Sequence, residues 1–270
     1  MTSTDKNYNL TILITASHIR THPSIRMICE TISSLKNITN MNQCHVILAH
    51  DYSSKKSYAN YLDNLKNYLK KENLNNITIA ERNSHGHLVG NIRNAITYVQ
   101  TEWILVMQHD FPFIREFDID KILDDMKSNP DMKHVKFPPG TIRSPDGPTG
   151  TWDRKNKLYG KQVYGEHYTY TRTAAWCDYN HICRTSYYTD LVLKECPDGV
   201  PMENILNPSC NESNHDKYGT YIFGGIGAPA YLHHLDGSKT LKSKKLDHIY
   251  RGIKNIETKI RKYLKRKNPL

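Results

Sequence analysis

Short apolar runs recur through the first half of the chain, and a segment with helical spacing follows each of the first three. Runs rich in β-branched residues predict buried strands at 10–15, 45–49, 77–80 and 103–107. Between them, apolar positions three or four residues apart predict helices at 25–35, 58–71 and 91–99. Strands that alternate with helices predict an α/β fold, with a mostly parallel central sheet flanked by helices.

The pattern changes after residue 137. Pro, Gly and Tyr are frequent in 137–165, which predicts irregular strands and loops. Further on, we expect strands at 221–223 and 231–234 and a short helix that begins at Glu203. We therefore expect one domain over 1–238, with two halves at about 8–115 and 116–238.

The segment 239–270 differs from this domain. Its apolar residues form one stripe on a basic amphipathic helix. It holds 12 of the 37 Lys and Arg residues and 2 of the 27 Asp and Glu residues, so the formal charge of +10 belongs to this tail. The neutral body argues against a nucleic-acid partner. Peripheral contact with an anionic membrane, packing on the domain and oligomer formation all remain open for the tail.

Composition narrows the setting in which the protein works. The six Cys residues include no Cys-x2-Cys pair, which argues against a structural zinc site. The first nine residues are polar, and no apolar run approaches the ~20 residues of a membrane span. We expect a cytoplasmic protein with free thiols, at most peripheral to a membrane surface.

Polar side chains gather where the predicted strands end, which is where ligands bind in parallel sheets. Thr15, Ser17 and Arg20 follow the first strand, and Asp51 follows the second. The fourth strand ends in Gln-His-Asp at 108–110. A carboxylate at the end of an apolar strand is costly without a partner, and a divalent cation on a diphosphate would supply one for Asp110. A cap on the turn that follows is the alternative role for Asp110.

The motifs around this strand resemble those of the inverting glycosyltransferase family 2 and its relatives. They are Gly-Asn-Ile-Arg-Asn-Ala at 90–95 and Thr-Glu-Trp-Ile-Leu-Val-Met-Gln-His-Asp at 101–110. The resemblance covers about 10–115 well and 195–238 more loosely. It implies a GT-A fold that binds a nucleoside-diphosphate sugar in the first half of the domain and an acceptor in the second.

The resemblance also implies roles for single residues. Asp51 would accept from the imide N–H of uracil, and Arg93 would lie near the diphosphate. Asp110 and a late histidine, His234 or His233, would hold Mn²⁺ or Mg²⁺; strand alternation allows only one of the two histidines on the ligand face. Thr15, Ser17, Arg20, Gln108 and His109 would surround the nucleotide sugar.

Two positions depart from the family pattern. Gln108 stands where the family has the first acidic residue of Asp-x-Asp, and it would bind a hydroxyl rather than a metal. His-Asp-Tyr-Ser at 50–53 replaces the usual Asp-Asp-Gly-Ser. The second departure weakens the assignment of uracil more than the assignment of the fold.

An inverting transfer needs a general base for the acceptor hydroxyl. Glu203 is the candidate, and Asp190 and Asp198 are its rivals. Aromatic residues of the second half would stack on sugars or pack in the core; they are Trp152, Tyr164, Tyr168, Tyr170 and Trp176.

The predicted function is transfer of a sugar from a UDP-sugar to a hydroxyl of a glycan or glycoconjugate. Two alternatives remain. A sugar-1-phosphate nucleotidyltransferase should carry a Gly-rich loop after the first strand, but 16–24 contains no Gly. A non-catalytic carbohydrate-binding protein of the same fold would bind nucleotide sugars without turnover.

Overall fold

The computed structural model describes residues 10–40, 44–142 and 158–235. The predicted basic tail at 239–270 and Trp152 lie outside these residues. Within them, no helix has both the length and the apolar character that crossing a membrane requires.

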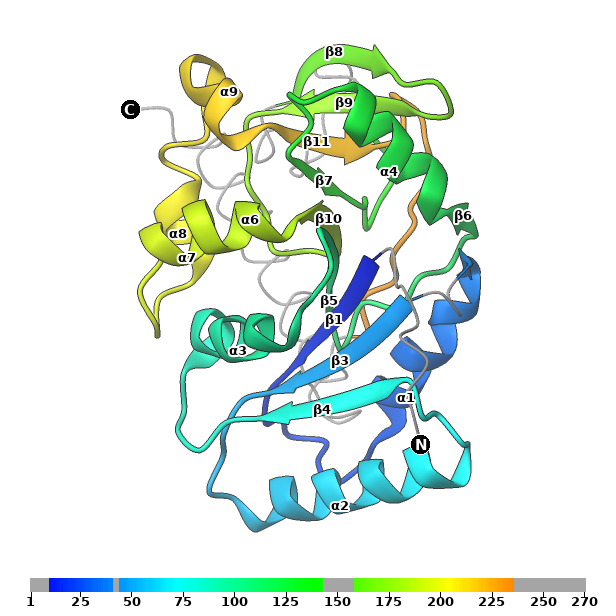
Figure 1. Ribbon diagram of the computed structural model, residues 1–270, viewed down its shortest axis with the longest axis vertical. Helices are drawn as coiled ribbons and strands as arrows, with labels where there is room; N and C mark the ends of the chain where they lie inside the picture. The colour runs from blue at the N-terminus through cyan, green and yellow to red at the C-terminus, as the bar shows by residue number, and fades with distance from the viewer. Residues whose placement is uncertain (1–9, 41–43, 143–157, 236–270) are drawn as a thin grey trace, which may run out of the picture.

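A nine-stranded sheet forms the centre of the described part of the chain (Figure 1). Its spatial order is β4 (Ile77–Glu81), β3 (Cys44–His50), β1 (Leu10–Ala16), β5 (Trp103–Gln108), β10 (His181–Arg184), β7 (His134–Lys136), β11 (Thr220–Phe223), β9 (Thr169–Thr173) and β8 (Leu158–Tyr164). A second, two-stranded sheet pairs β2 (Ile38–Thr39) with β6 (Phe117–Asp118).

The first four strands confirm the parallel arrangement expected from the sequence. β1 pairs in parallel with β3 and with β5, and β3 pairs in parallel with β4. β10 then runs antiparallel to β5, so the amino-terminal end of β10 lies at the same edge as the carboxyl end of β5. This reversal brings residues from the second half of the chain to the predicted ligand edge.

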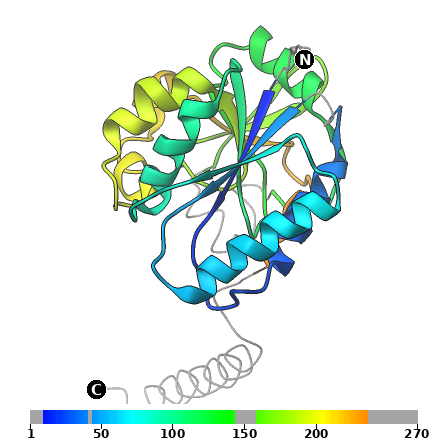
Figure 2. The same cartoon turned by 60° about the horizontal axis from the view of Figure 1, so that its bottom comes forward.

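Helices cover both faces of the sheet, as Figures 1 and 2 show. One face packs against α1 (Arg26–Ser33), α2 (Lys56–Lys71) and α4 (Ile119–Ser128). The other packs against α3 (His87–Ala95), α6 (Thr185–Tyr187), α7 (Leu193–Glu195), α8 (Met202–Leu206) and α9 (His215–Tyr218), with a π-helical turn over Tyr188–Val192. The strand β1 serves both cores, because Ile12 and Ile14 join one apolar cluster and Leu13 joins the other.

Several element bounds differ from the sequence-based expectations. α3 begins four residues earlier than predicted, at His87, and ends at Ala95 before a 3-10 turn. The end of 137–165, where irregular strands and loops were expected, forms β8, which pairs with β9 with a shift in register. The expected strand at 231–234 is reduced to a single bridge between Phe113 and Leu232.

Candidate functional site

A polar cavity of about 210 Å³ lies at the carboxyl ends of β1, β3 and β5, as the strand pattern predicts. The first turn of α3 and the residue Asp178, just before β10, complete its wall. The lining residues are Thr15, Ala16, Ser17, Asp51, His85, His87, Leu88, Asn91, Gln108, His109 and Asp178.

Asp51 is buried, and its two carboxylate oxygens have different surroundings. Oδ1 accepts hydrogen bonds from the backbone N–H groups of Tyr52 and Gly86, each at 2.9 Å. Oδ2 lies 2.8 Å from His85 Nδ1 in an ion-pair contact but accepts no hydrogen bond of good geometry. Oδ2 is therefore buried without a hydrogen bond, and its close polar neighbour is the exposed His85 ring.

Two more lining residues carry buried acceptor atoms without a partner. Asn91 donates from Nδ2 to the carbonyl oxygens of Ala16 and Ala49, which leaves its Oδ1 unpaired. His109 places Nδ1 3.2 Å from the carbonyl oxygen of Thr15, so Nδ1 carries the proton and the unpaired Nε2 is an acceptor. Burial lowers the pKa of His109, which keeps its ring neutral.

The predicted metal corner is brought together by the chain that returns past β5. His234 Nε2 lies 3.2 Å from Asp110 Oδ2, and the His234 ring stacks on Phe111 with 4.5 Å between ring centroids. Asp110 Oδ1 is buried without a partner. A carboxylate with an orphaned oxygen beside an imidazole fits a Mn²⁺ or Mg²⁺ ligand set. Of the two late histidines, His234 makes this contact.

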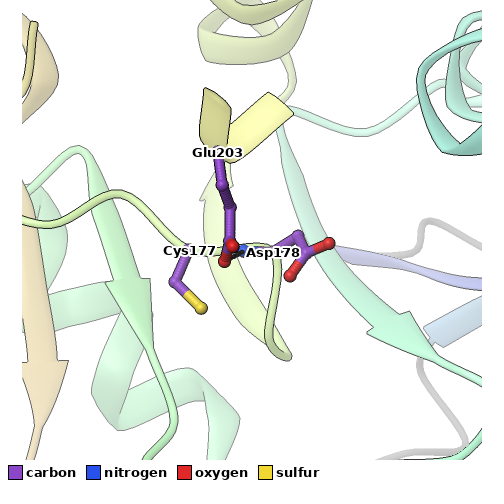
Figure 3. A group of neighbouring side chains, drawn as sticks. All are labelled: Cys177, Asp178 and Glu203. Carbon is purple, nitrogen blue, oxygen red and sulfur yellow. Dashed lines mark hydrogen bonds between the residues drawn. The ribbon is translucent and has the colours of Figure 1, made fainter. Parts of the chain in front are cut away.

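Two acidic groups meet at the amino-terminal end of β10 (Figure 3). Glu203 Oε1 lies 3.4 Å from the backbone N of Asp178, and Gln108 Nε2 donates to the Asp178 carbonyl oxygen at 3.0 Å. Burial and the nearby Glu203 raise the pKa of Asp178 to about 7. Of these two carboxyl groups, only Asp178 lines the cavity.

Cys177 joins this pair, and the three side chains offer ligand atoms within 4.8 Å of one another. Burial raises the pKa of the Cys177 thiol well above its usual value, so it is a protonated thiol and a poor ligand. The buried ammonium of Lys136 donates to the Ala175 carbonyl oxygen at 2.9 Å. Burial lowers the pKa of Lys136, and the nearby Glu203 is one of the groups that oppose this shift. Asp110 therefore fits a hard divalent ion better than this cluster does.

Other predicted site residues lie away from the cavity. Arg93 donates to Asp198 Oδ1 and to the carbonyl oxygens of Leu193 and Cys196, so it ties α3 to α7 rather than facing the cavity. Arg20 is exposed and does not line the cavity. The rival bases are also elsewhere: Asp198 pairs with Arg93, and exposed Asp190 pairs with Lys194.

The aromatic residues expected near an acceptor divide between core and surface. Trp176 and Tyr170 are buried, and the Tyr170 hydroxyl donates to Asp125. The Tyr168 hydroxyl accepts from the Asp118 backbone N, and Tyr164 is exposed. None of these four lines the polar cavity.

Sequence reasoning missed three residues at this site. Arg82 contacts Asp51 at 3.8 Å and donates to the Gly90 carbonyl oxygen, so it puts a cation beside Asp51 without lining the cavity itself. His85 and Asp178 line the cavity wall directly. Arg82 could have been found from the sequence, because it closely follows the third predicted strand. The sequence offers no such signal for Asp178.

The fold and the strand-end cavity define a protein of the GT-A glycosyltransferase class. The model of the family described as Glycosyl transferase family 2 matches residues 18–188, more than half of the chain. The chain belongs to this family. No curated protein sequence matches it.

The solved structure of one glycosyltransferase agrees with this fold. The chain is similar to TarS of S. aureus, with 11% identity and a TM-score of 0.50 over 84% of this chain and 36% of TarS. A mannosyltransferase from Pyrobaculum calidifontis in complex with GDP-Man and Mn²⁺ has 10% identity and a TM-score of 0.49, over 83% of this chain and 56% of that one. The chain thus spans about a third of TarS and little more than half of the mannosyltransferase.

Proposed function

We propose that this protein transfers a sugar from a UDP-sugar to a hydroxyl of a glycan or glycoconjugate, with inversion and with a divalent metal. The observation that carries this proposal is the set of buried acceptor atoms on residues lining the cavity: Asp51 Oδ2, Asn91 Oδ1 and His109 Nε2. Buried polar atoms in native proteins nearly always have partners, so this set calls for a ligand rich in donors. A nucleoside supplies ribose hydroxyls and a base N–H.

The two oxygens of Asp51 favour uracil over guanine. Guanine presents two adjacent N–H donors, which suit both oxygens of a free carboxylate. Here Oδ1 already accepts from two backbone N–H groups, so a single acceptor remains for the base. The one imide N–H of uracil matches that acceptor.

The spatial order of the strands places the reacting groups at the other end of the site. Asp51 follows β3, whereas Asp178 precedes β10, and β1 and β5 lie between these two strands. Three strand spacings span roughly 14 Å, which suits a nucleotide sugar better than a single sugar. The nucleoside would bind near Asp51, and the transferred sugar near Gln108 and Asp178.

Asp110 and His234 would hold the metal beside the diphosphate. When bound, a divalent ion neutralises the charge that builds up on the leaving diphosphate. The acceptor oxygen attacks the anomeric carbon from the opposite face, and a carboxylate takes its proton. Glu203, the base expected from the sequence, lies beside Asp178 at this end of the cavity.

Binding of UDP to the full chain, with and without Mn²⁺, tests this proposal. A ligand at one hundred times its Kd adds about 2.7 kcal/mol of stability, so UDP with Mn²⁺ should raise the melting temperature by several degrees. Asp110→Ala should lose the Mn²⁺-dependent part of this shift. Asp124→Ala, which removes an exposed carboxylate from α4, is the matched control and should behave as wild type.

Two results would count against the proposal. Unchanged Mn²⁺-dependent binding in Asp110→Ala would remove the metal from this corner. Tight UDP binding without any release of UDP from UDP-sugars would favour a carbohydrate-binding protein over an enzyme.

A further inference from the structure

The two carboxyl groups beside β10 occupy unequal positions. Glu203 extends from α8 to the backbone of 177–178, whereas the Asp178 carboxylate extends sideways, away from Cys177 (Figure 3). Asp178 lines the cavity and Glu203 does not. A group that removes a proton must reach the substrate, and of the pair Asp178 is the one placed to do so.

Asp178 also lies at the end of the cavity where transfer would take place. The antiparallel entry of β10 beside β5 puts Asp178 next to Gln108, whose side chain donates to its carbonyl oxygen. The nucleoside acceptor Asp51 lies three strands away along the same edge. A base at this position would face the sugar and acceptor rather than the nucleoside.

The surroundings of Asp178 suit proton transfer near neutral pH. The titratable groups that face it or lie next to it are Glu203 from α8, His109 directly after β5, Tyr188 from the π-helical turn and the adjacent Cys177. A hydrogen bond with the Gln108 side chain opposes the upward shift of the Asp178 pKa. The charged group of Lys136 interacts with Glu203. Two carboxyl groups this close bind one proton more readily than either would alone.

We propose that Asp178 is the catalytic residue that receives the acceptor proton and that Glu203 is a positioning residue for Asp178. The acceptor O–H bond breaks and its proton passes to an Asp178 oxygen. A bond forms between the acceptor oxygen and the anomeric carbon, and the bond from that carbon to the diphosphate oxygen breaks, its electron pair leaving with the UDP. This division of roles rests on the proposed glycosyl transfer.

The test compares Asp178→Asn and Glu203→Gln in the full chain. UDP affinity with Mn²⁺ is measured by calorimetry. Release of UDP from UDP-glucose, UDP-galactose and UDP-N-acetylglucosamine is followed from pH 5 to pH 9, with water as the acceptor. Asp190→Asn is the matched control, because it removes an exposed carboxylate that pairs only with Lys194 and Thr189 among described residues.

Asp178→Asn should lower the rate by about 10²- to 10⁴-fold, the usual contribution of a general base, while UDP affinity stays within about twofold. Glu203→Gln should lower the rate less. It should also move the acidic limb of the pH profile to lower pH, because loss of a neighbouring negative charge lowers the pKa of Asp178. Asp190→Asn should match wild type in both measurements.

Three outcomes overturn the assignment. Asp178→Asn could retain most of the rate while Glu203→Gln abolishes it, which makes Glu203 the base. Glu203→Gln could leave the pH profile unmoved. Asp178→Asn could lose UDP binding together with its melting transition, which makes Asp178 a structural residue. Failure of the wild-type chain to bind UDP overturns the proposed function itself and is separately visible in the calorimetry.

Discussion

At the residue scale, the two oxygens of the buried Asp51 side chain differ, and the proposed function gives each a separate role. Two backbone N–H groups, from Tyr52 and Gly86, compensate the burial of Oδ1 and join the end of β3 to the start of α3. Oδ2 has no hydrogen bond, so it is the atom proposed to accept from the N–H of a base. Replacing this one oxygen with an NH₂ group should therefore change which nucleotide binds.

Asp51→Asn makes that exchange. The amide oxygen can keep the two backbone hydrogen bonds, while an NH₂ group replaces the free acceptor. UDP should bind roughly ten- to a hundredfold more weakly, since a hydrogen bond to a charged group contributes about 1.5–3 kcal/mol. CDP should lose less affinity or gain some, because cytosine N3 is an acceptor that the new NH₂ can bind. Calorimetry with UDP and CDP measures both.

Asp63→Asn, an exposed change on α2, is the control for this exchange and should leave both affinities unchanged. Equal weakening of UDP and CDP in Asp51→Asn would place the base elsewhere in the cavity.

Asp51 and Asp110 could be predicted from the sequence because each closes an apolar strand, and strand ends converge in a parallel sheet. His234 required knowledge of the family pattern, since its contact with Asp110 joins residues far apart in the chain. Asp178 was not predictable. Its position depends on the antiparallel insertion of β10, which no local pattern of the sequence indicates.

At the element scale, the first half of the sheet followed from periodicity, whereas the second half did not. β1, β3 and β5 are almost wholly apolar, as buried strands are. β9 reads Thr-Tyr-Thr-Arg-Thr and has no apolar run, although three of its residues are buried. Its Thr171 hydroxyl donates to the Gly224 carbonyl oxygen, a long-range partner that no local pattern reveals.

Arg93 joins two of these elements, α3 and α7. Its guanidinium donates to two backbone carbonyl oxygens and to Asp198. Arg93→Ala should therefore destabilise the fold by about 1–3 kcal/mol and leave UDP affinity within twofold. Urea unfolding and calorimetry check the two parts.

Arg26→Ala is the control for Arg93, because Arg26 is highly exposed and pairs only with Glu30 four residues on and with Ser24, within the described residues. It should change stability by less than about 0.5 kcal/mol. A tenfold loss of UDP affinity in Arg93→Ala at unchanged stability would return Arg93 to the diphosphate, as the sequence suggested.

At the scale of the whole molecule, buried histidines link folding to pH. Burial lowers the pKa of His50 and of His181 to about 4 each, and it lowers the pKa of His134 well below the usual 6.5. They lie on three different strands of one sheet, so their contributions to the free energy of unfolding add. Asp178 acts in the opposite sense, because its raised pKa makes the folded state bind a proton that the unfolded chain lacks.

Stability should therefore fall as the pH drops from 6.5 toward 4. Above 6.5 these histidines are neutral in both states. Below it the unfolded chain takes up protons that the folded chain excludes, at up to about 1.4 kcal/mol per pH unit for each group. Three histidines outweigh the single carboxyl of opposite sign. Urea unfolding between pH 7 and pH 4.5 should show the decline, and stability that is flat or rises would contradict it.

His50→Gln isolates one of these contributions. The His50 ring contacts the Tyr61 hydroxyl and the Leu48 carbonyl oxygen of its own strand, and glutamine can replace the contact with the Tyr61 hydroxyl. The variant should be less stable at pH 7, since it alters a packed core. Its stability should decline less steeply toward pH 5, because unfolding then takes up as much as one proton fewer. His233→Gln removes an exposed histidine and should keep the wild-type slope. If both variants keep the full slope, the acid sensitivity arises from groups other than His50, and the link between this strand and pH is lost.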